Sequence, residues 1–448
     1  MDEIEKEIEA EAEQVIAAGR AGGKRLGRFL RILGPGVITG AADDDPSGIA
    51  TYSQAGAQFG TSILWTMLWS IPLMVAVQEH CATIGAVTGK GLAAVIKQHY
   101  SRNILFFVVL LMVMANTLNI GADIGAMAAS TSLVVPVPSY ILAPLYSLLI
   151  LILVITMSYR TYVRLLKWLA LTLLAYLATA LIVHVNWSSA LQATVWPHFG
   201  LTKDYIFMLT AILGTTISPY LFFWQTSEVV EEEIAEHRLA QKGGVPRVSS
   251  RFMRNLRLDN AFGMLVSDVS AWFIILVGAV VLHAGGVTNI NTAADAAKAL
   301  EPLVHGFPNA GLVAKLIFAA GVVGLGLLAV PTLAGSASYA LSETFGWKEG
   351  LYRKYKSAKN FYQIIILSTL IGLLIVFSGV DPVKALIYSA VFNAMAAVPL
   401  LALIGHIGRR QDIMGNYRKS RLNNGLVWLA FGLMAVASVA VIYGLFHP

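Results

Sequence analysis

Residues 33–60 read LGPGVITGAADDDPSGIATYSQAGAQFG, an apolar stretch with three consecutive carboxylates at its middle. Ionisable groups at membrane depth are costly and usually line a polar pathway. Proline lacks an amide hydrogen and disfavours the α conformation of the residue before it, so Asp45-Pro46 interrupts a helix, and Gly48 allows a further bend. We predict two half-helices over 33–58 that meet at an unwound, carboxylate-bearing point near the bilayer midplane. The alternative is a cytoplasmic turn between two amphipathic helices.

The composition is that of a polytopic membrane protein, because 56% of the 448 residues are hydrophobic and only 13% are charged. The single cysteine, Cys81, excludes an intramolecular disulfide and a cysteine-based zinc cluster. The first 14 residues are acidic and lack the basic start and apolar core of a secretory signal. We therefore expect the first apolar segment to direct its own insertion.

An all-α fold with eleven membrane spans is predicted from the apolar segments that follow a cytoplasmic tail over 1–32. Several segments exceed the roughly 20 residues that cross a bilayer, so tilt or interruption is expected. The predicted spans are 33–58, 62–88, 103–131, 139–157, 163–186, 205–228, 256–284, 310–341, 361–379, 383–407 and 424–446.

The basic residues predict the orientation of these spans. With the N-terminus inside, all but four of the 32 lysines and arginines fall in cytoplasmic segments, and such a bias sets topology. We predict a multi-pass protein of the inner cell membrane with its N-terminus inside and its C-terminus outside. The same bias accounts for the net charge of +6, so a nucleic-acid partner is not expected. The four exceptions are Lys203, Lys298, Lys315 and Lys384.

Span six, YIFMLTAILGTTISPYLFFWQTSE, carries a second interruption near Ser218-Pro219. Spans one and six are five apart, and five is odd, so they occupy equivalent places in two inverted repeats. We predict a first repeat over 33–186, an inverted second repeat over 205–407, and an additional helix over 424–446. Paired interruptions of this kind indicate the site of an alternating-access transporter. Taken alone, the second interruption could be a simple proline kink.

These residues resemble the Nramp family of divalent-metal transporters, whose LeuT-type fold consists of two inverted five-helix repeats. The match covers essentially the whole transmembrane part and is most specific in span one. It runs through Asp45-Pro46, Ala50-Thr51 and 54–60 into Leu64-Trp65, and more weakly through Val87-Thr88-Gly89, Asp123, Ser218-Pro219, Asn393 and Pro399-Leu400.

The chain departs from the family's signatures at both interruptions. The family has Asp-Pro-Gly-Asn in span one, where this chain has Asp-Pro-Ser-Gly at 45–48, so the asparagine ligand is missing. In span six, Met-Pro-His becomes Ser-Pro-Tyr at 218–220, and Thr215 stands where a family alanine offers its carbonyl. Gln225 replaces a second family histidine. In span three, two family acidic residues become Asn116 and Ala126.

These departures imply a harder site than that of the family. A thioether favours transition metals, whereas carboxylates, carbonyls and water suit Mg²⁺ and Mn²⁺. Mg²⁺ usually keeps several waters and is held by one or two carboxylates. The loss of both histidines and of two acidic residues also removes groups suited to carrying protons. The pattern is similar to the Nramp-related magnesium transporters, a branch that moves Mg²⁺ and Mn²⁺ without proton coupling.

We predict Asp45 as the principal metal ligand, with a helix cap as its alternative role. The other predicted ligands have structural alternatives too, because hydroxyls can bond back into their own helix and an asparagine can bridge two helices. These ligands are Asp44, Ser218, Thr215 and Asn393. The residues predicted to line the pathway or support the ligands are Asp43, Gly48, Tyr220, Gln225, Asp123 and Asn116.

The sequence therefore predicts a secondary transporter for largely hydrated Mg²⁺ and for Mn²⁺, working by alternating access without a coupled proton. Its expected partners are the cation and the lipid bilayer, and no resident cofactor is expected. Motifs of enzymatic chemistry such as GxxxxGK[ST] or HExxH are absent from the sequence. The alternatives are a proton-coupled Mn²⁺/Fe²⁺ symporter, an organic-substrate carrier of the same fold, and a cation channel or membrane cation sensor.

Overall fold

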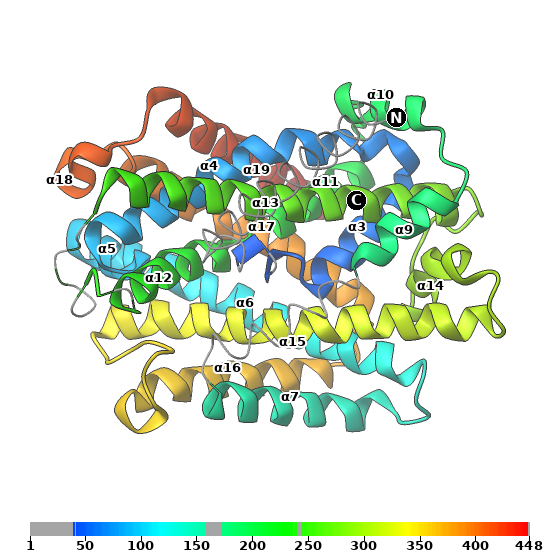
Figure 1. Cartoon of the computed structure of the whole chain (residues 1–448), viewed down its shortest axis with the longest axis horizontal. Helices are drawn as coiled ribbons and strands as arrows, with labels where there is room; N and C mark the ends of the chain where they lie inside the picture. The colour runs from blue at the N-terminus through cyan, green and yellow to red at the C-terminus, as the bar shows by residue number, and fades with distance from the viewer. Residues whose placement is uncertain are drawn as a thin grey trace, which may run out of the picture.

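The computed structural model describes residues 39–40, 42–157, 173–235, 237–239, 244, 246 and 248–446. Every regular element in this part of the chain is a helix. Nine helices among these residues are long and apolar enough to cross a membrane. Several of them run along the long axis of the molecule, and α15 (Ala310–Phe345) extends across it, while others cross at an angle (Figure 1). The predicted all-α class is confirmed.

The long helices begin and end within a few residues of the predicted spans, with two exceptions. The helix after the second break continues to Ala235, beyond the predicted end at 228, and the next one begins at Ser250, before the predicted start at 256. Because hydropathy identified these spans, their ends fall where charged or turn residues replace apolar ones. The remaining long elements are α4 (Trp65–Thr88), α6 (Arg102–Ser132), α7 (Ser139–Thr156), α11 (Lys203–Thr216) with α12 (Pro219–Ala235), α13 (Ser250–Val277), α16 (Lys359–Val376), α17 (Pro382–Ile407) and α19 (Arg421–Phe446).

Two predicted spans and the tail fall partly or wholly outside the described residues. The tail over 1–32 lies outside them. The span predicted at 33–58 is represented by helical residues just before Asp44 and by α3 (Pro46–Phe59). The span predicted at 163–186 is represented by α9 (Leu174–Ile182). The division into two repeats stays a prediction.

Short helices that the hydropathy pattern did not predict cover the two ends of the long helices. At one end lie α5 (Leu92–His99) and α18 (Gln411–Met414), and at the other lie α10 (Trp187–Val195) and α14 (Ala293–Ala297) (Figure 1). They are too short to produce a membrane-span signal. Side chains cap the start of some of these short helices. At the start of α10, for example, Asn186 Oδ1 accepts a hydrogen bond from Ser189 N.

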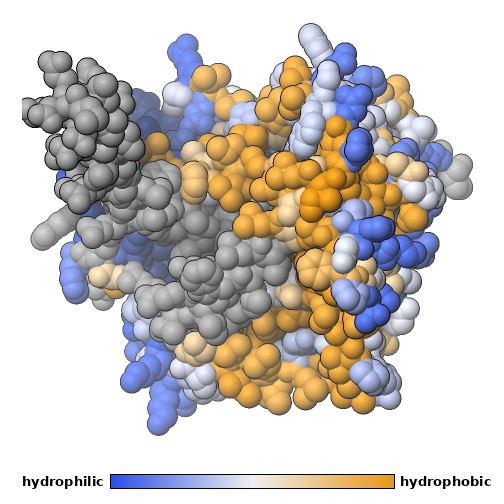
Figure 2. All heavy atoms as spheres, turned by 45° about the vertical axis from the view of Figure 1, so that its right-hand side comes forward, coloured by the Kyte–Doolittle hydropathy of each residue, from blue (hydrophilic) through white to orange (hydrophobic). Residues whose placement is uncertain are grey.

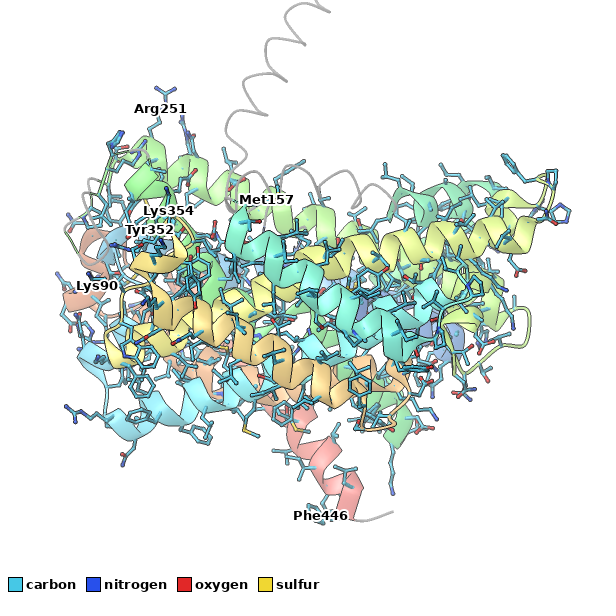
Figure 3. The ribbon with its side chains drawn as sticks, turned by 90° about the horizontal axis from the view of Figure 1, so that it is seen from below. Lys90, Met157, Arg251, Tyr352, Lys354 and Phe446 are labelled. Carbon is cyan, nitrogen blue, oxygen red and sulfur yellow. The ribbon has the colours of Figure 1, made fainter. Side chains whose placement is uncertain are left out.

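The distribution of side chains over the surface agrees with a membrane-spanning body. Hydrophobic side chains form a broad field on the face shown in Figure 2. Lys90, Arg251, Tyr352 and Lys354 lie near one end of the molecule (Figure 3), and they come from three separate segments that the sequence predicts to be cytoplasmic. The end that carries α5 and α18 therefore matches the predicted cytoplasmic side.

Both predicted helix interruptions are present. Ala42 and Asp43 are helical, Asp44 and Asp45 are not, and α3 begins at Pro46. Likewise, α11 ends at Thr216 and α12 begins at Pro219. In each case a proline is the first residue of the second half-helix, the position at which its missing amide hydrogen costs least.

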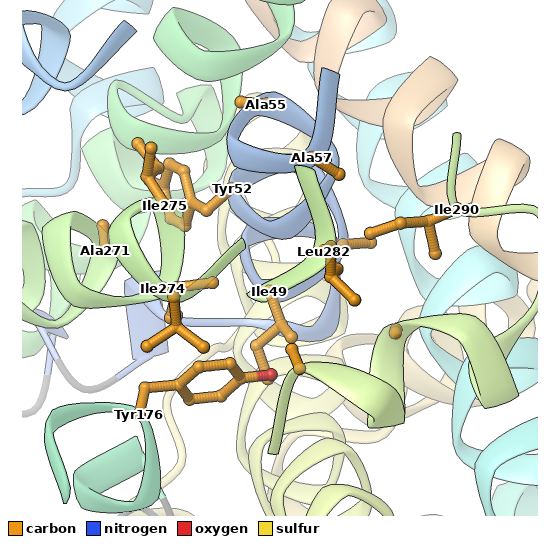
Figure 4. Close-up of a cluster of buried hydrophobic side chains, with 14 of the residues drawn as sticks. Ile49, Tyr52, Ala55, Ala57, Tyr176, Ala271, Ile274, Ile275, Leu282 and Ile290 are labelled. Carbon is orange, nitrogen blue, oxygen red and sulfur yellow. The ribbon is translucent and has the colours of Figure 1, made fainter. Parts of the chain in front are cut away.

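The helix α3 packs closely against the end of α13 and the π-helical turn η3 (Gly278–His283) that continues it (Figure 4). A β-carbon placed on Gly56 would lie 2.2 Å from the carbonyl oxygen of Ile275, so only glycine fits there. His283 Nδ1 lies 2.7 Å from Ala57 O, to which it donates. Beyond η3, the amide of Ile290 donates to Gln54 Oε1 at 2.7 Å. Backbone contact and hydrogen bonds thus join α3 to this segment.

Candidate functional site

Two hydrogen bonds join the interrupted spans at their breaks. Tyr220 Oη donates to Ala42 O at 2.9 Å, and Tyr52 Oη lies 2.9 Å from Thr216 Oγ1. Residue 42 lies opposite residue 220, and residue 52 lies opposite residue 216. The two segments therefore run antiparallel to each other. The two breaks, whose prolines at 46 and 219 are 173 residues apart in the sequence, therefore meet in the interior.

Each break leaves one carbonyl without its helical donor, and a hydroxyl replaces that donor. Pro46 cannot donate to Ala42 O, and Tyr220 donates to it instead. Pro219 cannot donate to Thr215 O, and Ser218 Oγ donates to it at 2.7 Å, with Gly214 O also 2.9 Å away. Buried carbonyls are costly when unpaired, so these hydroxyls stabilise the interruptions.

Tyr220 and Gln225 therefore have structural contacts at the predicted pathway. Tyr220 bridges the two interrupted spans, as described above. Gln225 accepts a hydrogen bond from Thr39 Oγ1, in the first half of span one. Both side chains are fully buried on α12. They hold the half-helices together, and their predicted place along the pathway stays a prediction.

Asp45 is the N-cap of α3 and is held at both carboxylate oxygens. Its Oδ1 accepts from Gly48 N at 2.7 Å, and its Oδ2 accepts from Asn119 Nδ2 at 2.9 Å. Only 2% of its surface is exposed. The helix-cap role considered as an alternative is therefore present. A carboxylate offers about four acceptor positions, so two hydrogen bonds leave lone pairs for an ion.

Asn119 and Ser389 are site residues that the sequence analysis missed. Asn119 Oδ1 accepts from Ser389 Oγ at 2.7 Å, which connects Asp45 through α6 to α17. The sequence contains a pattern that indicates both residues. Asn119 and Asp123 are four residues apart in span three, and Ser389 and Asn393 are four residues apart in span ten. Residues four apart share a helix face, and polar pairs on one face of an apolar span indicate a polar contact inside the protein.

Asp43 and Asp44 face α13, whereas Asp45 faces α6. Ser267 Oγ lies 2.8 Å from Asp43 Oδ2 and 2.9 Å from Asp44 Oδ1. A hydroxyl has one proton, so it can donate to only one of these oxygens at a time. The neighbouring Asp268 accepts from Ser70 Oγ at 3.0 Å. The three adjacent aspartates thus diverge, and Asp44 is oriented toward Ser267.

Thr215 faces the same space as the Asp45 carboxylate, beside Gly48. A β-carbon built on Gly48 would lie 3.5 Å from Thr215 Oγ1 and 3.7 Å from Asp45 Oδ1. The Thr215 hydroxyl is buried and has no hydrogen-bond partner among the described residues. Ser218, in contrast, donates back to its own helix, which was its alternative role. The geometry therefore favours Thr215 over Ser218 as a source of a ligand oxygen.

Three further predicted residues carry buried polar atoms on α6 and α17. The carboxylate of Asp123 and the side-chain amide of Asn393 have no partner among the described residues. Asp123 lies one helical turn beyond Asn119, within electrostatic range of Asp45. Asn116 donates to Leu333 O of α15 at 2.8 Å, so it joins two helices. Buried polar groups normally have partners, so Asp123 and Asn393 are candidates for contact with an ion or its water.

The residues at the breaks can bind a cation through oxygen atoms. Positions 43–48 and 214–220 contain carboxylates, hydroxyls and carbonyls and no methionine, cysteine or histidine. Among the described residues, no group of three or more acidic, histidine or cysteine side chains has the spacing of a metal cage. Such a site suits a hard cation that keeps part of its hydration.

Comparisons with known proteins agree on one family. The divalent metal cation transporter MntH of Yersinia enterocolitica is 26% identical over 430 residues, which is 92% of this chain and 96% of that protein. The MntH protein of Klebsiella pneumoniae is also 26% identical, over 93% of this chain and 94% of that protein.

Solved structures show the same fold. A manganese transporter of Eremococcus coleocola superposes with a TM-score of 0.73 at 17% identity, over 92% of this chain and 86% of that one. The nucleobase-cation symporter MHP1 superposes with a TM-score of 0.54 at 13% identity, over 92% and 91%. The fold is thus of the predicted LeuT type. The family described as natural resistance-associated macrophage protein-like matches residues 36–444, and the chain therefore belongs to the Nramp family.

Proposed function

We propose that this protein carries divalent cations across the inner cell membrane, with largely hydrated Mg²⁺ preferred and Mn²⁺ second. The main observation behind this proposal is the buried Asp45 carboxylate at the meeting point of the two interrupted spans. Beside it lies the hydroxyl of Thr215, which has no hydrogen-bond partner among the described residues. Interrupted helices at the midplane form the binding sites of alternating-access carriers. The names of the MntH relatives, which describe them as divalent metal cation transporters, support the cation class.

The preference for Mg²⁺ rests on the chemistry of the atoms at the breaks. These atoms are oxygens, and oxygen ligands suit Mg²⁺ and Mn²⁺ better than soft transition metals. Few direct ligands suit Mg²⁺ in particular, because it gives up its water reluctantly. Asp43, Asp44 and Asp268 add buried carboxyl groups close by. Ser267 has one proton for Asp43 and Asp44, so one of these carboxyls lacks that hydrogen bond, and a cation beside them would offset the repulsion between neighbouring carboxylates.

The carrier would work by rocking and gating around the fixed site, without a coupled proton. Moving two positive charges inward across about 100 mV releases about 4–5 kcal/mol, which suffices to drive uptake. Tyr220 and Gln225 stand at the positions of the family's two histidines. Asn116 and Ala126 stand at the positions of two of its acidic residues. None of these side chains exchanges protons near neutral pH. Transport, and not catalysis, is therefore the proposed activity.

The second candidate is a proton-coupled symporter for Mn²⁺ or Fe²⁺. Two observations favour it: Asp123 is retained as a buried carboxylate without a described partner, and the Eremococcus coleocola neighbour is a manganese transporter. A channel or cation sensor is the third candidate. The three differ in ion preference, in proton movement and in rate.

The test is ion flux into proteoliposomes that contain the purified protein. Mg²⁺, Mn²⁺ and Ca²⁺ are offered one at a time at a fixed membrane potential, and the internal pH is recorded. We expect Mg²⁺ uptake without internal acidification. Asp45→Ala should abolish uptake, and Asp412→Ala, which removes an exposed carboxylate far from the breaks in sequence, should leave it unchanged.

Each alternative has its own result in this experiment. Uptake of Mn²⁺ but not Mg²⁺, with matching acidification, would establish the proton-coupled symporter instead. Currents far above the turnover of a carrier would identify a channel. No flux of any cation, or full uptake by Asp45→Ala, would overturn the proposed function.

A further inference from the structure

Asn119 connects the Asp45 carboxylate to two helices outside the interrupted spans. Its Nδ2 donates to Asp45 Oδ2 at 2.9 Å, and its Oδ1 accepts from Ser389 Oγ at 2.7 Å. The same hydroxyl also lies 2.7 Å from Leu386 O of its own helix, so its one proton can go to either of the two acceptors. Asn119 is fully buried and Ser389 is 4% exposed, so bulk water does not compete for these bonds.

The orientation of the Asn119 amide follows from its two partners. A carboxylate oxygen can only accept, so the NH₂ group faces Asp45, and the amide oxygen then faces the hydroxyl of Ser389. Among the described residues, Asn119 is the one side chain from another element that hydrogen-bonds to Asp45. The other fixed contact, Gly48 N to Oδ1, belongs to α3 itself. One oxygen of Asp45 is thus held by its own helix and the other by α6.

We infer that Asn119 is a positioning residue that sets the direction of the Asp45 carboxylate and thereby the ion preference of the site; the inference rests on the proposed function. A carboxylate held at both oxygens cannot turn both of them toward one bare ion. The positive end of the Asn119 amide also lies beside Oδ2, where it repels a cation that approaches directly. A hydrated ion avoids both costs, because its water can donate to the remaining lone pairs of Asp45.

Asn260 of α13 provides a control outside the predicted site residues. It is also a fully buried asparagine, and its amide donates to Val75 O of α4 at 3.3 Å. Replacing either asparagine by leucine removes a hydrogen bond between two spanning helices. Only the replacement of Asn119 removes a contact to Asp45. A difference between the two variants therefore reports on Asp45 and not on the loss of a buried asparagine.

The experiment compares Asn119→Leu, Ser389→Ala and Asn260→Leu with the unchanged protein in proteoliposomes. The concentration of Mg²⁺ and of Mn²⁺ that gives half-maximal uptake is measured separately from the maximal rate. We expect Asn119→Leu to raise the value for Mg²⁺ about tenfold, the effect of one lost hydrogen bond to a charged group. The value for Mn²⁺ should change less, so the preference for Mg²⁺ falls. Ser389→Ala should shift Mg²⁺ in the same direction by about threefold.

Several results would overturn the inference. An unchanged half-saturating concentration and ion preference in Asn119→Leu would do so. A loss of maximal rate that is equal for both ions, or an equal shift in Asn260→Leu, would show a purely structural role. If Asn119→Leu does not fold, Ser389→Ala decides by the same measure. Failure of the proposed function is distinct, because then the unchanged protein takes up no cation or Asp45→Ala retains uptake.

Discussion

Gly48 lies between two side chains that are candidates to share an ion. A β-carbon at this position would be 3.5 Å from Thr215 Oγ1, 3.7 Å from Asp45 Oδ1 and 3.2 Å from Tyr52 Cε2. The contact with Tyr52 is tight, but the ring can shift by a few tenths of an ångström. The absence of a side chain at Gly48 therefore keeps open the space in front of the Asp45 carboxylate.

We expect Gly48→Ala to reduce the initial rate of Mg²⁺ uptake at least tenfold while the melting temperature changes little. The methyl group occupies the space beside Asp45, whereas the gain in helix propensity of up to about 1 kcal/mol offsets the tight contact. Uptake by proteoliposomes and thermal unfolding in detergent measure the two effects. Gly432→Ala in α19 is the control, because a β-carbon there meets nothing within 4 Å.

Normal uptake by Gly48→Ala would contradict this prediction. It would mean that the ion does not enter the space between Asp45 and Thr215. The candidate ligands would then have to be sought on the other side of Asp45, toward Asp123.

The interruption of span one depends on span six for its missing hydrogen-bond donor. Tyr220, at the start of α12, supplies the donor that Pro46 cannot give to Ala42 O. The interruption of span one is therefore stabilised by a residue of span six. This dependence explains why the half-helices meet at a fixed register.

We expect Tyr220→Phe to lower the stability by about 1–3 kcal/mol, because the buried carbonyl of Ala42 loses its donor. The measurement is the midpoint of thermal unfolding of the purified protein. Tyr140→Phe is the control, since the Tyr140 side chain is exposed at the start of α7. Equal midpoints for the two variants would show that the bond between Tyr220 and Ala42 contributes nothing.

The sequence predicted those features of the fold that depend on neighbouring residues. Hydropathy located the long helices, and Asp45-Pro46 and Ser218-Pro219 located both breaks, because a proline acts on its own backbone and on the turn before it. It did not predict which way the three aspartates face. Their partners, Ser267 on α13 and Asn119 on α6, lie far away in the sequence, and helix packing brings them to the breaks.

The same distinction applies to the candidate ligands. Ser218 and Thr215 looked equivalent in the sequence, but Ser218 donates to the carbonyl that Pro219 leaves open, and Thr215 has no described partner. The sequence does not mark Asn119 as a site residue, because an asparagine in an apolar span commonly joins two helices. Only its packing against Asp45 gives it a place at the site.

The orientation of the whole molecule is testable because its one cysteine, Cys81, is fully buried. Ser188 of α10 and Ser357 lie exposed at the predicted outer and cytoplasmic sides. In intact cells, a membrane-impermeant maleimide should label Ser188→Cys and should label Ser357→Cys only after permeabilisation. The unchanged protein, which should stay unlabelled, is the control. The reverse pattern would overturn the predicted topology.

The close packing of α3 on the end of α13 limits how the outer half of the protein can move. Gly56 lies against the backbone of Ile275, and Gln54 holds the chain at Ile290, so α3 cannot tilt without taking this segment along. The helix α3 and this segment therefore form one packed unit. Gln54 of α3, Ile290, and Lys384 and Tyr388 of α17 together line a cavity of about 160 Å³. A tilt of α3 together with the segment at Ile290 would therefore change the width of this cavity beside α17.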